Sequence, residues 1–97
     1  MILKSVTRVA QDIVLEGGIP AKVIAEKIGK PYSTLLRELN PFDEHAKLGV
    51  ETLMQIMRVT RNAKPLEYMA AEMGLRLVPQ EGGERRPAYL RHDVQQA

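Results

Sequence analysis

The chain has 97 residues, which is enough for one small domain. It contains no cysteine, so disulfides and cysteine-ligated metal sites are excluded, and the composition agrees with a reducing cytoplasm. Charged residues interrupt the apolar pattern near the N-terminus, which argues against a signal peptide, and no apolar window is long enough to cross a membrane. We therefore expect a soluble, cytoplasmic protein. The formal net charge of +2 is too small to identify a nucleic-acid binder by itself.

The first part of the chain predicts two helices separated by a glycine pair. Apolar residues recur at helical spacing over residues 3–16, where Ser5 is a candidate N-cap. The Gly-Gly pair ends this helix. Pro20 then stands in the first turn of a second helix, where proline is accepted, and this helix stops at Gly29.

The middle of the chain predicts three more helices. A third helix begins at Pro31 in the same way and ends at an Asn-Pro pair. Residues 41–49 are charged or turn-forming and are expected to form a loop. Apolar residues at i, i+3, i+4 and i+7 predict a fourth helix over residues 50–61 and a fifth over residues 65–73.

The last part of the chain predicts no regular structure. No segment alternates with period two for long enough to form a central strand, and only Leu75, Leu77 and Val78 suggest a short extended piece. The remaining sequence is polar, which favours flexibility. The sequence therefore predicts an all-α protein, with a five-helix domain over residues 1–78 and a flexible tail over residues 79–97.

The second and third helices together fit a helix-turn-helix over residues 19–40. Two short helices that cross tightly need a small residue, here Ala25, and a left-handed turn four residues later, here Gly29. The spacing of these residues and Leu35 resembles that of λ-repressor-like domains in phage repressors and Cro proteins. Lys30 departs from that pattern because an apolar residue is usual there, but its stem can cover the core while its charge stays in water. The apolar residues expected to join the two helices to the core are Ile24, Ile28, Leu35 and Leu39.

The distribution of charge supports a nucleic-acid partner for this unit. Residues 20–37 contain four basic side chains and one acidic side chain, whereas three of each cancel between residues 48 and 74. A local excess of positive charge is what an electrostatic contact with DNA needs. The alternative for residues 19–40 is a plain helical hairpin without a role in DNA binding.

In helix-turn-helix domains the N-terminal part of the second helix of the unit enters the major groove. In that position Arg37 can form bidentate hydrogen bonds to guanine, Ser33 can bond a base edge or a phosphate, and Leu36 can meet a thymine methyl group. The expected base-facing residues are Tyr32, Ser33, Leu36 and Arg37, and the expected phosphate contacts are Lys22, Lys27, Lys30 and Thr34.

Each of these assignments has a structural alternative. Tyr32 can pack against the domain, and Leu36 can belong to the half-buried core. Arg37 can pair with Glu38 or with another neighbouring carboxylate. Surface lysines are usually only solubilising, so the prediction depends on their clustering.

Three segments, in this order and spacing, resemble the CII-type regulators of temperate phages related to coliphage 186. They are IAEKIGKPYSTLLRELNP at 24–41, KLGVETLMQIM at 47–57 and LEYMAAEMG at 66–74. The resemblance extends over residues 3–78, about four fifths of the chain, and leaves the tail after Pro79 outside.

The resemblance implies a sequence-specific transcriptional regulator, often an activator in the lysis–lysogeny decision, that acts as an oligomer on repeated half-sites. It assigns the DNA-facing helix to residues 31–40. The implied partners are double-stranded DNA, further copies of the chain in a dimer or tetramer, and RNA polymerase, at the nucleoid of a bacterial host and without a cofactor or membrane. For self-association, four methionines either form a dimer face or fill the core: Met54, Met57, Met69 and Met73.

Catalysis finds little support in the sequence. His45 and His92 lie in the loop and the tail without a partner at ligand spacing. The adjacent side chains of residues 43–45 cannot converge on a metal without an unusual backbone, and the glycine pairs lack the other residues of a phosphate-binding loop. The alternative function from another class is a helical protein-interaction module, such as an adaptor or antirepressor, which would be indifferent to DNA. The affinity of a DNA-binding regulator should instead fall steeply with salt.

Overall fold

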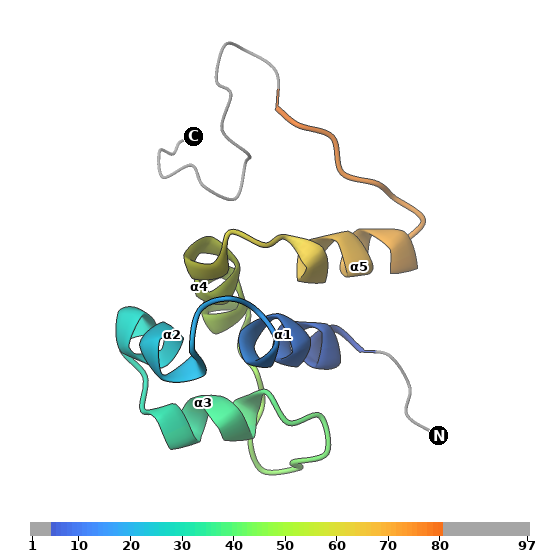
Figure 1. Ribbon diagram of the computed structural model, residues 1–97. Coiled ribbons are helices and arrows are strands. Elements are labelled where there is room, and N and C mark those ends of the chain that lie inside the picture. The colour runs from blue at the N-terminus through green and yellow to red at the C-terminus, as the bar shows by residue number, and fades with distance from the viewer. Residues whose placement is uncertain (1–4, 81–97) are drawn as a thin grey trace.

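Five helices make up the part of the chain that the computed structural model describes, residues 5–80, and this part contains no strand. The all-α prediction with five helices is therefore confirmed (Figure 1). The helices are α1 (Val6–Leu15), α2 (Ala21–Ile28), α3 (Tyr32–Glu38), α4 (Val50–Thr60) and α5 (Lys64–Glu72).

The helix boundaries lie close to the predicted ones. The start of α1 differs from its predicted position because of an N-cap. Ser5 has an extended backbone, and its hydroxyl accepts a hydrogen bond from the backbone N–H of Arg8 at 3.1 Å. This is an N-cap, so Ser5 stands outside the helix and the predicted start at residue 3 is too early. The extended piece suggested over residues 75–78 does not form a strand, and the side chains of Leu75, Leu77 and Val78 are exposed. Residues 81–97, which hold most of the predicted tail, lie outside the described residues.

The core lies around α1, which packs against α2, α4 and α5. Its buried apolar side chains occupy the positions that the helical spacing of the sequence predicted. Those of α2 and α3 belong to the same hydrophobic core. The largest fully buried side chains are Val14, Ile24, Leu35, Leu39, Ile56 and Pro65.

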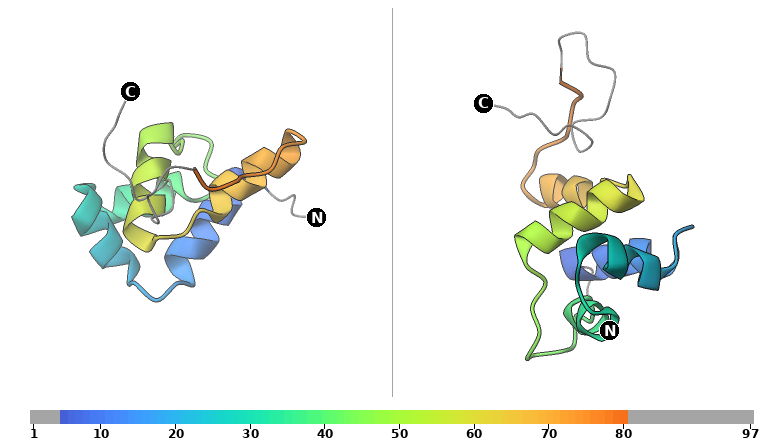
Figure 2. Two further views of the ribbon diagram at one scale, coloured as in Figure 1. Left: turned by 90° about the horizontal axis from the view of Figure 1, so that it is seen from above. Right: turned by 90° about the vertical axis from the view of Figure 1, so that its left-hand side faces the viewer.

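The helices are arranged so that α3 and α5 occupy opposite ends of the molecule (Figures 1 and 2). In Figure 1 α3 lies at the bottom, α1 and α2 lie between, and α4 and α5 lie at the top. The view from the side in Figure 2 shows the same order. A surface on α3 is therefore separate from a surface on α5. Among the described helices, none has the length and apolar character that a membrane span requires.

Candidate nucleic-acid interface

The turn between α2 and α3 is built on a glycine in the left-handed conformation. Gly29 has φ 74° and ψ 32°, a region that side-chain-bearing residues rarely adopt. The backbone N–H of Lys30 donates to the carbonyl of Ala25 at 3.0 Å, which closes the end of α2. Ala25 itself is buried. The chain thus leaves α2 abruptly and begins α3 after only three residues, as a helix-turn-helix requires.

One side of α3 is anchored in the core and the opposite side is open to solvent. Leu35 and Leu39 are buried, whereas Ser33 and Arg37 are exposed. Ser33 and Arg37 are four residues apart, so they lie on the same side of the helix. Other side chains flank this exposed side: Tyr32 is partly exposed, and Thr34 and Leu36 are half-buried. Of the base-facing residues expected from the sequence, Tyr32, Ser33 and Arg37 are therefore exposed, whereas Leu36 is half-buried.

The first turns of α2 and α3 are joined by a contact between Lys22 and Tyr32. The Lys22 ammonium lies 5.6 Å from the centre of the Tyr32 ring, within the range of a cation–π interaction. This contact places the positive charge of Lys22 beside the N-terminal end of α3. It also gives Tyr32 a packing role within the domain while leaving part of its ring accessible.

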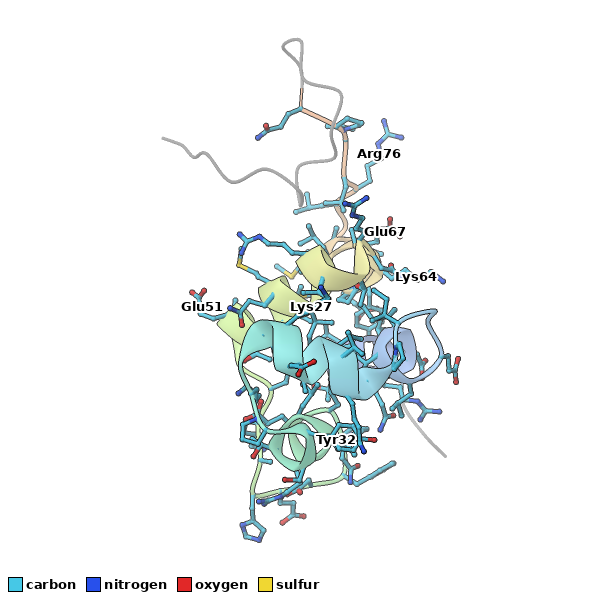
Figure 3. The ribbon with its side chains drawn as sticks, turned by 60° about the vertical axis from the view of Figure 1, so that its left-hand side comes forward. Lys27, Tyr32, Glu51, Lys64, Glu67 and Arg76 are labelled. Carbon is cyan, nitrogen blue, oxygen red and sulfur yellow. The ribbon has the colours of Figure 1, made fainter. Side chains whose placement is uncertain are left out.

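Lys27 lies on a different side of α2 from Lys22 and away from Tyr32. It is five residues after Lys22, which corresponds to about 140° around a helix axis. In Figure 3 Lys27 lies on the side of α2 toward α4, whereas Tyr32 lies at the start of α3 on the other side. The structure brings Lys22 to Tyr32 at the start of α3, whereas Lys27 lies on another side of α2.

Lys30 is held by an ion pair that the sequence analysis missed. Its ammonium lies 3.0 and 3.2 Å from the two carboxylate oxygens of Glu38. The Lys30 and Glu38 side chains are 24% and 16% exposed, so this pair is partly shielded from water. The Lys30 charge is therefore compensated by Glu38 instead of standing free in water, and Glu38 is not the partner of Arg37. The sequence signal was a lysine in the turn and a glutamate two helical turns into α3.

Arg37 pairs with an aspartate from the loop that follows α3. Its Nε donates to Oδ2 of Asp43 at 3.2 Å. The Arg37 side chain is 59% exposed and the Asp43 side chain 18% exposed. Hydrogen bonds from the backbone N–H of His45 and from Arg37 hold the pKa of the Asp43 carboxyl below its ordinary value of 3.8. The alternative in which Arg37 meets a neighbouring carboxylate is thus realised, with Asp43 as the partner.

The loop does not assemble a metal site from residues 43–45. The Asp43 carboxylate is already engaged by Arg37 and by the His45 backbone. Within residues 5–80, no three side chains of histidine, aspartate or glutamate are grouped so that they could hold a metal ion.

The methionines divide between the core and the surface. Met57 is 5% exposed and Met69 packs against the core, so these two have the core-filling role. Met54 is partly exposed and Met73 is 74% exposed. Helix α5 and the segment after it carry several exposed apolar side chains. These are Leu66, Met73, Leu75, Leu77 and Val78.

Comparison with known proteins identifies the family. Residues 4–97 match the family described as phage regulatory protein CII (CP76). The match reaches the last residue, so it includes the tail that the resemblance found in the sequence left outside. No curated protein and no solved structure matches the chain significantly. Because the family match covers nearly the whole chain, the protein belongs to the phage regulatory protein CII family.

Proposed function

We propose that the protein is a sequence-specific DNA-binding regulator of phage transcription, with α3 in the major groove. The observation that carries this proposal is the exposed side of α3, where Ser33 and Arg37 face solvent while Leu35 and Leu39 fix the helix to the core. A helix presented in this way, after a left-handed turn, is the arrangement with which helix-turn-helix domains read base edges.

Arg37 is the proposed reader of a guanine. Its Nε is bonded to Asp43, and its two terminal nitrogens make no hydrogen bond to another of the described residues. Two donors on one planar group match the O6 and N7 acceptors of guanine in the major groove. Ser33, one turn earlier on the same side, is placed to donate to a base edge or a phosphate. Tyr32 and Leu36 border this surface and are proposed to make apolar contacts with the bases.

Phosphate contacts are proposed mainly for the start of the two helices. Lys22 stands beside Tyr32, next to the N-terminal end of α3, so its charge can meet the DNA backbone on that side. Thr34 is half-buried at the edge of the same surface. Lys30 can contribute only by sharing its ammonium with Glu38, and Lys27, on the side toward α4, is the weakest of the proposed contacts.

We also propose that the regulator acts as an oligomer of at least two copies. A single module of this size makes few base contacts, so specific sites usually comprise two half-sites about one helical turn apart. Helix α5 and the segment that follows it, which carry several exposed apolar residues, lie at the end of the molecule opposite α3 (Figure 1). A second copy bound there would cover these side chains without occupying the reading surface.

Selection of bound sequences from random duplex DNA, followed by a salt titration on the enriched site, tests the proposed function. We expect enrichment of a sequence with repeated half-sites and an affinity that falls as the salt concentration rises, with a slope set by the number of phosphate contacts. Enrichment of no sequence, together with no binding at low salt, would contradict the proposal and favour a helical protein-interaction module.

A further inference from the structure

The aspartate that follows α3 holds the side chain proposed to read the base. Oδ2 of Asp43 accepts a hydrogen bond from Nε of Arg37 at 3.2 Å, across six positions of the sequence. Arg37 stands out in solvent, whereas the Asp43 side chain is largely shielded. The exposed Arg37 side chain is therefore held by the shielded Asp43 side chain.

The loop fixes the Asp43 carboxylate through a series of short hydrogen bonds. Its other oxygen, Oδ1, accepts from the backbone N–H of His45 at 2.8 Å. The backbone N–H of Asp43 donates to the carbonyl of Asn40 at 3.1 Å, and the side-chain oxygen of Asn40 accepts from the N–H of Phe42 at 2.9 Å. These are the turns that aspartate and asparagine form with their own backbone. With Oδ1 committed to the loop, Oδ2 is left to face Arg37.

This arrangement constrains the guanidinium before any DNA is bound. An arginine side chain loses considerable rotamer freedom when it is ordered in an interface, and that loss weakens binding. The bond to Asp43 uses Nε and leaves the two terminal nitrogens for a second, bidentate partner. A guanidinium held in this way is already oriented when the helix meets the groove.

We infer that Asp43 is a positioning residue for Arg37, and that it sets the preference for guanine at the base pair that Arg37 reads. This inference rests on the proposed function of α3. Asp43 itself touches no base: it carries a negative charge close to the DNA, so its direct effect on any duplex is repulsive. Its two effects therefore have opposite signs, because it raises discrimination between bases and lowers affinity for DNA of any sequence.

The test compares Asp43→Asn with the wild-type protein on the selected site, on the same site with the guanine replaced, and on random DNA. Asparagine keeps a side-chain oxygen that can accept from the His45 N–H, but it removes the charge that attracts Arg37. We expect the preference for guanine to fall by roughly 3- to 10-fold, the effect of freeing one long side chain. Binding to random DNA should be unchanged or tighter, whereas damage to the loop would weaken binding to every duplex.

Two controls and one substitute variant make the test specific. Asp12→Asn makes the same change of charge in a carboxylate that pairs with Arg8 on α1, at 3.4 Å, and should leave the guanine preference unchanged. In an Arg37→Ala background, Asp43→Asn should have no effect on the preference. If Asp43→Asn does not fold, as judged by circular dichroism, Asp43→Ser retains an acceptor for the loop and replaces it.

The outcomes separate the inference from the proposed function. A wild-type protein that selects no sequence contradicts the proposed function. A wild-type protein that selects a sequence while both Asp43 variants, correctly folded, keep its guanine preference contradicts the role of Asp43 alone. The role of Asp43 is also contradicted if Asp43→Asn lowers the guanine preference equally in the wild-type and the Arg37→Ala backgrounds.

Discussion

The turn between α2 and α3 can be tested by exchanging Gly29 for alanine. Gly29 has φ 74°, and a Cβ added to it would meet no heavy atom within 4 Å. The substitution therefore causes no steric clash, and its cost is the backbone strain of a left-handed residue, about 1–2 kcal/mol. Gly18 is the matched control, because a Cβ there also meets no atom within 4 Å but the backbone is not in the left-handed region.

Urea unfolding followed by circular dichroism measures both variants. We expect Gly29→Ala to lower the free energy of unfolding by about 1–2 kcal/mol. Gly18→Ala should be neutral or raise the free energy of unfolding by up to about 1 kcal/mol, because alanine reduces the freedom of the unfolded chain. The comparison requires equal slopes with denaturant. If Gly29→Ala has the same free energy of unfolding as Gly18→Ala, the reasoning that position 29 requires glycine for a left-handed backbone is refuted.

The remaining predictions concern phosphate contacts, pH and assembly. Lys22→Ala should reduce the slope of log affinity against log salt by about 0.9, and Lys27→Ala should leave it nearly unchanged; equal effects in a salt titration would contradict the assigned sides of α2. Because the pKa of Asp43 is lowered by folding, its carboxylate stabilises the protein above the ordinary value of 3.8, and this contribution is lost as the pH falls through the lower, folded value. The difference in free energy of unfolding between wild type and Asp43→Asn, measured by urea at a series of pH values, should therefore be constant above 3.8 and begin to shrink as the pH falls below it, and a difference that stays constant there would refute the linkage. Met73→Lys should weaken self-association in sedimentation experiments without loss of helix, whereas Leu15→Lys, at an exposed position on α1, should not; the proposed oligomer face is wrong if both or neither dissociate.

The helices were predictable because their signals are local. Pro20 and Pro31 mark the starts of α2 and α3, although both are N-caps that precede the first turn in which they were predicted. Gly29 stands where α2 ends, and the apolar spacing of α3 correctly indicated that Leu35 and Leu39 are buried. The first helix was placed too early because periodicity continued through its cap, although Ser5 itself indicated the boundary.

The ion pairs around α3 were not predictable in the same way. Glu38 could have met Arg37 or Lys30, and only the path of the chain through the turn brings Lys30 to it. Asp43 reaches Arg37 because two side-chain turns fold the loop back onto α3, and their geometry is not encoded in a periodic pattern. These pairs depend on tertiary structure.

The position of Lys27 could have been inferred from the sequence. A separation of five residues places it on a different side of α2 from Lys22, whatever surrounds the helix. The sequence argument counted the lysines along the chain and did not consider on which side of the helix each one lies. The four methionines of α4 and α5 also show that the apolar spacing alone does not predict burial. Met57 is buried, whereas Met73, at the end of α5, is exposed.

The central claim, that α3 reads DNA through Arg37, is tested most directly by the binding of Arg37→Ala to the selected site and to random DNA. The matched control is Arg58→Ala, which removes an exposed arginine from α4. We predict that Arg37→Ala loses about 1–3 kcal/mol of binding free energy on the selected site, relaxes the preference at one base pair and binds random DNA almost as the wild type does. An equal loss on every sequence, or a loss no larger than that of Arg58→Ala, would contradict the claim.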